Sequence, residues 1–372
     1  MFRFTVHAIA LALTLALPLA TATVAAAKPI VEVVFVLDTT GSMARLIEGA
    51  KRKIWSIATS IVECSPDAEI RMGLVAYRDI GDEYVTRKFQ LTTDIQGLYA
   101  DLLRFRAQGG GDWPESVNEA LHTAVSKLSW TDGPGVTRII FLVGDAPPHM
   151  DYAHDVKYPE VMRMARRMGI TVNAVQAGNA RDTERVWREI AQLGRGEYIP
   201  IPQDGGKMVS IESPYDRDII EMQGKINGTV LPYGPRDQQR TVHDKLGQLR
   251  AAPAPAASDL ATYMYKRSYK SATAEAITGR GDLVADVAAG RQKLGEVKDE
   301  DLPDSLKSLS ATERKAHLDR QMAERKALND KLSDLVRKRD AYVAEQRKKQ
   351  PATTGDSFDR AVEATLKAQI KR

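Results

Sequence analysis

The chain has 372 residues, of which 43% are hydrophobic and 27% are charged, so its composition is close to that of ordinary globular proteins. Its formal net charge of +4 is small and is spread over many charges of both signs, so we expect no nucleic-acid partner. Cys64 is the single cysteine, which excludes an intramolecular disulfide.

The first 27 residues have the pattern of an export signal. Arg3 supplies a positive charge, the stretch from Ala8 to Ala20 is almost wholly apolar, and residues 25–27 are alanines. The alternative is a membrane anchor, but the apolar run is short for a spanning helix. We therefore expect cleavage after Ala27 and a periplasmic or extracellular protein with no integral membrane segment after signal cleavage.

From residue 30 onward, short apolar runs alternate with segments in which apolar residues recur every three or four positions. The predicted strands cover residues 30–37, 69–77, 84–91, 138–143, 170–175 and 197–201. The predicted helices cover residues 43–61, 114–128, 160–168 and 182–193, and Asp94 is expected to cap a further helix. This alternation predicts an α/β fold with a doubly wound, mostly parallel central sheet flanked by helices on both faces.

The second half of the chain has a different organisation. A helix over residues 214–227 is expected to close a first domain, which spans residues 28–235. Two prolines among the alanines of residues 251–257 indicate a linker, which we place at residues 236–260. Residues 261–372 are expected to form a helical C-terminal extension.

Two helices are predicted within this extension. Ser310 and Glu313 have the spacing of a capping box, and a long charged helix is expected to follow to about Lys348. Apolar residues at steps of four from Phe358 to Ile370 predict a second, shorter helix. The two helices are interpreted as a hairpin or a coiled-coil-like appendage that mediates self-association, and a partly disordered run of charges is the alternative.

Oxygen-bearing side chains gather where the predicted strands end. Asp38 and Asp145 each follow a strand, and ligands of such sheets bind outside the carboxyl ends of the strands. Asp38, Thr40 and Ser42 alternate along one turn, so all three side chains can point to one side. Hard divalent cations prefer such ligands. The alternative is that Asp38 is a plain strand-end acid and that Thr40 or Ser42 caps the next helix.

Three segments, in this order along the chain, carry a family resemblance. They are the turn from Asp38 to Ser42, the loop Gly109-Gly110-Gly111-Asp112, and the strand end at Gly144-Asp145. Together they resemble the metal-ion-dependent adhesion site of von Willebrand factor type A domains, over roughly residues 29–202. The metal ligands implied by the resemblance are Asp38, Thr40, Ser42, Asp112 and Asp145. The implied cation is Mg²⁺, with Mn²⁺ or Ca²⁺ as alternatives.

The resemblance also implies a protein ligand whose acidic side chain completes the coordination of the metal. Asp112 stands where the adhesive, integrin-like branch of the family has a threonine. Its carboxylate would either bind the metal directly or hold a water beside it. An additional carboxylate reduces the positive charge of the site, which weakens the case for capture of a partner's carboxylate.

Two residues near these loops are candidates for contact with a partner. Trp113 follows Asp112 directly, and aromatic side chains often anchor interfaces; the alternative is that it packs under its own loop. His149 lies beyond Asp145 on a proline-rich segment that also carries His154. We expect this segment to be a solvent-exposed loop, and a transition-metal site is the alternative.

Three further acids are given structural roles. Asp79 and Asp82 follow a predicted strand and are interpreted as loop acids, with peripheral metal ligation as the alternative. Glu115 is expected to stabilise the first turn of its helix, and a supporting role beside the metal loop is the alternative.

The favoured function is a non-catalytic, metal-dependent protein-binding module rather than an enzyme. A first alternative is a phosphoaspartate-type, Mg²⁺-dependent phosphatase, in which Asp38 would attack phosphate and Asp145 would help hold the metal. Thr40 speaks against it, because related hydrolases use an acid at that position for proton transfer. A second alternative is a structural module in which the metal only braces the loops.

Overall fold

The structure, a computed structural model, describes residues 28–206, 211–252, 254–268, 275–349 and 358–370. The predicted export signal in residues 1–27 lies outside this part of the chain. Within the described ranges, no helix combines the length and the hydrophobicity that crossing a bilayer requires.

A six-stranded sheet with the strand order β3-β2-β1-β4-β5-β6 forms the centre of the molecule. All neighbouring strands are parallel except β3, which runs antiparallel to β2 at one edge. The strands are β1 (Ile30–Asp38), β2 (Glu69–Tyr77), β3 (Thr86–Thr92), β4 (Val136–Gly144), β5 (Ile170–Ala177) and β6 (Arg195–Ile201). The predicted mostly parallel sheet is confirmed.

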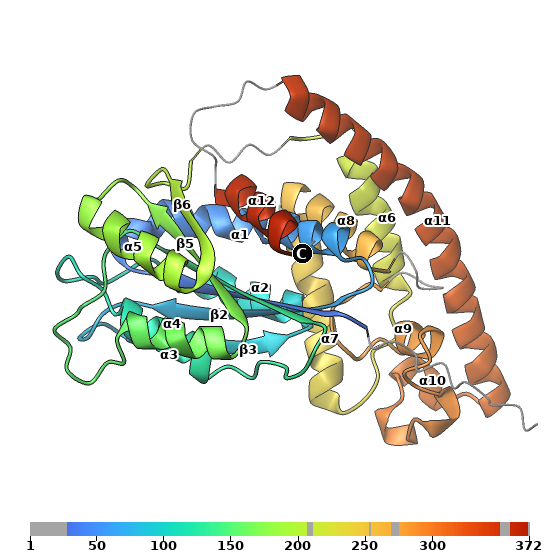
Figure 1. Ribbon diagram of the computed structural model, residues 1–372. Helices are drawn as coiled ribbons and strands as arrows, with labels where there is room; N and C mark the ends of the chain where they lie inside the picture. Colours follow the sequence, from blue (N-terminus) through green and yellow to red (C-terminus); the bar gives the residue numbers. More distant parts are fainter. Residues whose placement is uncertain (1–27, 207–210, 253, 269–274, 350–357, 371–372) are drawn as a thin grey trace, which may run out of the picture.

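Helices cover both faces of this sheet (Figure 1). Val31 and Val33 of β1 are buried in one apolar core with α1 and α2, whereas Val34 and Val36 are buried in a second core with α3, α4 and α5. Successive residues of a strand point to opposite faces of the sheet. A strand that is buried on both faces is therefore apolar along its whole length. The helices are α1 (Ala44–Cys64), α2 (Ile95–Arg104), α3 (Val117–Ser126), α4 (Tyr158–Arg167) and α5 (Arg181–Leu193).

The predicted linker at residues 236–260 is wrong, because this segment forms helices. The C-terminal part consists chiefly of α6 (Asp216–Gly228), α7 (Arg236–Ala251), α8 (Ala254–Ser268), α9 (Leu283–Ala288), α10 (Asp304–Lys307), α11 (Ala311–Lys349) and α12 (Phe358–Ile370). Pro255 falls in the first turn of α8, where a proline costs no helical hydrogen bond. The Ala/Pro composition therefore marks a helix start rather than an extended linker.

The C-terminal helices pack onto the sheet-containing part of the chain. Leu260 and Tyr263 of α8, and Val362 and Leu366 of α12, share a single apolar core with α1 and β1. The long helix α11 runs along α6, α8 and α9 at the right of Figure 1. Its predicted capping box is confirmed, since the backbone N–H of Ser310 donates to Glu313 Oε2 at 2.9 Å. The extension is thus folded against the domain rather than projecting from it.

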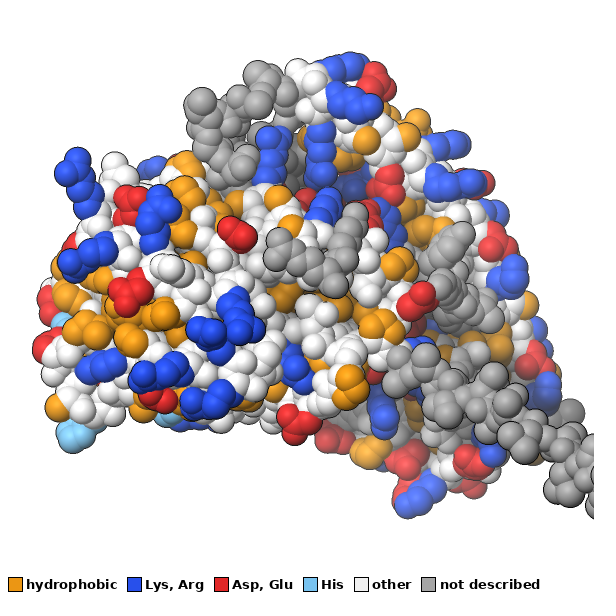
Figure 2. Space-filling model, viewed as in Figure 1, with side chains coloured by type: hydrophobic (Ala, Val, Ile, Leu, Met, Phe, Trp, Pro, Cys, Tyr) orange, Lys and Arg blue, Asp and Glu red, His pale blue; other side chains and the backbone are white. Residues whose placement is uncertain are grey.

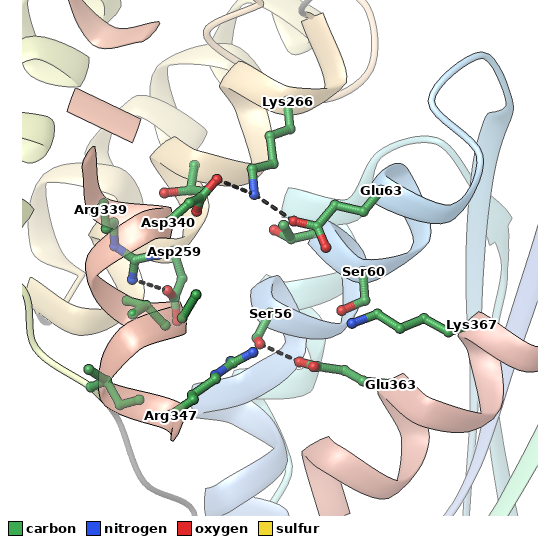
Figure 3. A pocket seen from close by; sticks show the side chains of 15 residues that line it. Ser56, Ser60, Glu63, Asp259, Lys266, Arg339, Asp340, Arg347, Glu363 and Lys367 are labelled. Carbon is green, nitrogen blue, oxygen red and sulfur yellow. Dashed lines mark hydrogen bonds and ion pairs between the residues drawn. The ribbon is translucent and has the colours of Figure 1, made fainter. Parts of the chain in front are cut away.

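A polar pocket of about 460 Å³ lies where α1, α8, α11 and α12 meet (Figure 3). Most of the charges that line it are paired across these helices. Lys266 Nζ lies 2.6 Å from Glu63 of α1 and 2.8 Å from Asp340 of α11, and Ser56 Oγ of α1 donates to Glu363 of α12 at 2.6 Å. We interpret these contacts as the polar part of the joint between the extension and the domain.

The outer surface of the extension is polar. Figure 2 shows acidic and basic side chains interspersed along the rim that α11 forms. Among the described residues, the large apolar side chains that are exposed are Ile80, Leu103, Trp113, Met150 and Met168. None of them belongs to the C-terminal helices.

Candidate metal centre

The turn after the central strand β1 brings one carboxylate and two hydroxyls together. Asp38 is fully buried, and its Oδ1 accepts hydrogen bonds from the backbone N–H of Thr40 at 2.8 Å and from Thr40 Oγ1 at 2.6 Å. Thr40 Oγ1 also lies 3.4 Å from Ser42 Oγ. The other carboxylate oxygen of Asp38, Oδ2, is buried without a hydrogen-bond partner. The three oxygen-bearing side chains thus share one turn, and one buried oxygen still lacks a positive partner.

Asp145 stands at the end of β4, the strand next to β1. Its Oδ2 accepts a hydrogen bond from Gln203 Nε2 at 2.6 Å. Burial and the neighbouring Asp145 carboxylate together raise the pKa of Asp38 to about 7, against the hydrogen bonds from Thr40 that lower it. A side chain at Gly144 would collide with the hydroxyl of Tyr77 and approach Asp38 Oδ2 to 3.1 Å. Gly144 therefore allows the two strand ends to pack closely beside the carboxylates.

Glu115 belongs to the same charged cluster, a position that the sequence suggested only as an alternative. It precedes α3 instead of lying in its first turn, and its backbone bridges to the segment after β4: its N–H donates to Pro147 O at 2.9 Å, and its carbonyl accepts from His149 N at 3.1 Å. Its side chain is buried, with Oε2 unpartnered. Burial, followed by the charges of Asp38 and other nearby acids, raises the pKa of Glu115 to about 9. Its position directly after the glycine loop was the available signal.

These buried acids suit a cation. Carboxylates that are buried beside one another are costly when charged, and within the described residues no ion pair joins Asp38 or Glu115 to a basic side chain. An all-oxygen donor set of carboxylates and hydroxyls is typical of sites for hard divalent ions. The residues at this end of the sheet therefore fit a divalent cation.

The structure groups Asp112 with a different set of side chains. Its carboxylate is largely exposed, and Oδ2 lies 3.5 Å from Nε2 of His149. Asp79 Oδ2 lies at the same distance from Nε2. Asp79, Asp112 and His149 offer one ligand atom each, all within 4.8 Å of one another, so they could hold a metal ion. The predicted five-residue set is thus divided, with Asp38, Thr40, Ser42 and Asp145 near one another and Asp112 beside His149.

The prediction of a solvent-exposed loop at His149 is wrong, because only 5% of its surface is exposed. Its ring stacks on Tyr152, with ring centroids 4.0 Å apart, and Nδ1 lies 2.9 Å from Asp151 Oδ1. His154, on the same segment, is exposed as predicted. The proline-rich pattern could not reveal that His149 is held against Asp112 and Glu115, which follow the glycines of the loop.

The two acids after β2 hold this end of the molecule together. Asp79 is buried and accepts hydrogen bonds from Ser116 Oγ and from Tyr152 Oη, both at 2.7 Å. Asp82 Oδ2 accepts from the backbone N–H of Gly110 at 3.0 Å. Gly110 has φ +80°, a conformation that favours glycine. The interpretation of Asp79 and Asp82 as simple loop acids therefore understates their role.

Three exposed apolar side chains lie next to the cluster residues in sequence. Ile80, Trp113 and Met150 directly follow Asp79, Asp112 and His149 in sequence, and they are 60%, 47% and 49% exposed. Trp113 does not pack under its loop; its indole N–H donates to Asp182 Oδ2 at 2.6 Å. The loops that carry these residues lie at the left of Figure 1, at the opposite end of the molecule from α11.

Comparisons with known proteins agree with this architecture. Residues 32–209 match the family described as von Willebrand factor A domain. The alpha-protein kinase vwkA of Dictyostelium discoideum is 28% identical over 137 residues, which cover 36% of this chain and 21% of that protein. Human von Willebrand factor A domain-containing protein 7 is 28% identical over 214 residues, 56% of this chain and 22% of that protein. The chain thus spans less than a quarter of the length of these curated relatives.

Two solved structures are also similar. Proximal thread matrix protein 1 from the mussel byssus has a TM-score of 0.36 and 15% identity, over 48% of this chain and 43% of that one. The pilus adhesin SpaC from Lactobacillus rhamnosus GG has a TM-score of 0.36 and 18% identity, over 48% of this chain and 29% of that one. The family match and the observed sheet agree that residues 32–209 form a von Willebrand factor A domain.

Proposed function

We propose that this chain is an exported, non-catalytic binding protein. Its von Willebrand factor A domain holds a divalent cation, for which Mg²⁺ is the first choice, and it binds a protein through the face that carries this cation. The observation that carries the proposal is a set of buried acids with unpartnered carboxylate oxygens, on loops whose neighbouring residues include exposed apolar side chains. Asp38, Thr40, Ser42 and Asp145 would hold the cation, which supplies a fixed positive charge when bound.

The charges of the site bear on the kind of partner. The carboxylates of Asp38 and Asp145 would balance the two charges of a bound cation, because carboxylate ligands bind a metal in their charged form. The raised pKa of Glu115 favours its neutral form near neutral pH. A carboxylate from the partner would then gain less than at a more positive site. We infer that apolar contacts with Ile80, Trp113 and Met150 provide most of the affinity, because large, well-packed side chains dominate interfaces.

Affinity capture tests this proposal. The full chain is immobilised and exposed to the exported proteins of its source in Mg²⁺ and then in chelator. A specific partner should be retained only with Mg²⁺, and it should be lost with Asp38→Asn and weakened at least tenfold with Trp113→Ala. Met168→Ala serves as the matched control, because Met168 is also exposed but lies at the far end of α4.

Two results would contradict the proposal. Capture that persists in chelator and in Asp38→Asn would mean that the metal, if bound, only braces the loops. Mg²⁺-dependent hydrolysis of a phosphomonoester that vanishes in Asp38→Asn would instead make the protein a phosphatase.

A further inference from the structure

We propose that Asp79, Asp112 and His149 form a second cation site, separate from the oxygen site at Asp38, and that this second site takes a transition-metal ion such as Zn²⁺. Nε2 of His149 lies 3.5 Å from Asp79 Oδ2 and 3.5 Å from Asp112 Oδ2. Ligand atoms around a tetrahedral Zn²⁺ are separated by about 3.4 Å, given metal–ligand bonds of about 2.1 Å. Both distances from His149 suit two ligands of one small ion, and the ligand atoms of all three side chains lie within 4.8 Å of one another.

The imidazole of His149 is oriented for ligation. Nδ1 lies 2.9 Å from Asp151 Oδ1, so a neutral ring that donates from Nδ1 presents an unprotonated Nε2 to the cluster. Nε2 is buried without a hydrogen bond, and the ring is held flat against Tyr152, with an interplanar angle of 9°. A carboxylate that accepts from the other ring nitrogen is the usual support of a metal-binding histidine.

Asp79 is equally well supported. Ser116 Oγ donates to its Oδ1 and Tyr152 Oη donates to its Oδ2, both at 2.7 Å. Outer hydrogen bonds of this kind fix the orientation of a ligating carboxylate. Asp112, by contrast, is 61% exposed, which leaves one side of the site open for water or for a donor atom of a bound protein.

The two sites have different ligand atoms, so we expect them to prefer different metal ions. The site at Asp38 has only oxygen ligands, which suit Mg²⁺ and Ca²⁺. One imidazole with two carboxylates suits Zn²⁺ and its neighbours in the first transition row. The inference does not depend on the proposed partner-binding function, and it can fail while the oxygen site stands.

The same geometry is also compatible with a metal-free cluster in which a protonated His149 pairs with the neighbouring acids. Measuring zinc binding distinguishes a metal site from such a cluster. The full-length Asp38→Asn variant removes the oxygen site as a competitor and serves as the background. We expect it to bind one Zn²⁺ in equilibrium dialysis, and bound Co²⁺ to give visible absorption bands that Zn²⁺ displaces.

Substitutions in this background test each ligand. His149→Gln and Asp112→Asn should each weaken Zn²⁺ binding at least tenfold. Asp151→Asn should weaken it about tenfold, as expected for an outer partner. His154→Gln, a change of an exposed histidine on the same segment, should leave it unchanged. Asp112 is largely exposed, so its variant should fold even if that of His149 does not. Zinc affinity that is the same in Asp112→Asn as in the background, or an absence of zinc binding in the background, would overturn the proposal.

Discussion

Asp38→Asn is expected to stabilise the metal-free protein at pH 8 and to remove its response to Mg²⁺. The pKa of Asp38 is raised from 3.8 to about 7 by burial and by Asp145. A carboxyl group whose pKa is higher in the folded state favours folding while it is protonated, and this advantage is lost as the pH rises from about 4 to about 7. At pH 8 the ionised Asp38 lowers the free energy of unfolding by an amount on the order of 4 kcal/mol. An uncharged asparagine at this position avoids that loss.

Urea unfolding at pH 5 and pH 8, with and without Mg²⁺, measures this effect. In the wild-type chain, Mg²⁺ should increase the free energy of unfolding more at pH 8 than at pH 5, because the cation competes with protons for the same carboxylate. In Asp38→Asn the increase should disappear at both pH values. Asp132→Asn, which changes an exposed aspartate in the loop before β4, is the control. A metal-free Asp38→Asn protein that is less stable than the wild type at pH 8 would refute this account.

Leu366→Ala is expected to lower the free energy of unfolding of the whole domain by about 2–5 kcal/mol, the range for truncating a fully buried leucine. Leu366 of α12 is fully buried in the core that contains α1 and β1. Phe358, at the start of the same helix, packs edge-on against Phe35 of β1, with ring centroids 6.5 Å apart. Helix α12 therefore completes the layer that covers one face of the sheet.

Thermal and urea unfolding of full-length variants test this role. Ala364→Ser, a change at an exposed position of the same helix, should alter stability by no more than about 0.5 kcal/mol. A chain that ends at residue 349 should expose the apolar surface of α1, melt at a lower temperature and tend to aggregate. If that shorter chain unfolded at the same temperature as the full chain, α12 would be an appendage, as the sequence alone suggested.

Local sequence signals predicted the sheet and the two helices at the end of the chain well. The strand at 69–77 has the predicted bounds, because an apolar run flanked by polar residues is a local pattern. The linker failed because alanine with proline suits both a helix start and an extended segment. Helix α11 packs in turn against α9, α6 and α8, so its apolar residues need not follow one heptad pattern.

Within the candidate site, the sequence predicted only the positions of those residues that directly follow a strand. Asp38 and Asp145 lie at the ends of neighbouring strands, so topology brings them close. Asp112 and Glu115 instead depend on the path of the glycine loop, which Gly109 and Gly110 turn through positive φ values. Which face a loop residue presents, and whether an acid such as Glu115 is buried, follow from tertiary packing that no local pattern records.

Calorimetric titration of Mg²⁺ into the metal-free, full-length protein tests the central claim most directly. We predict one binding event in the wild-type chain and none in Asp38→Ala or Asp145→Ala. The event should persist in His149→Gln, whose side chain belongs to the separate cluster. Unchanged Mg²⁺ affinity in both aspartate variants, or no Mg²⁺ binding by the wild-type chain, would contradict the claim that these strand ends form a cation site.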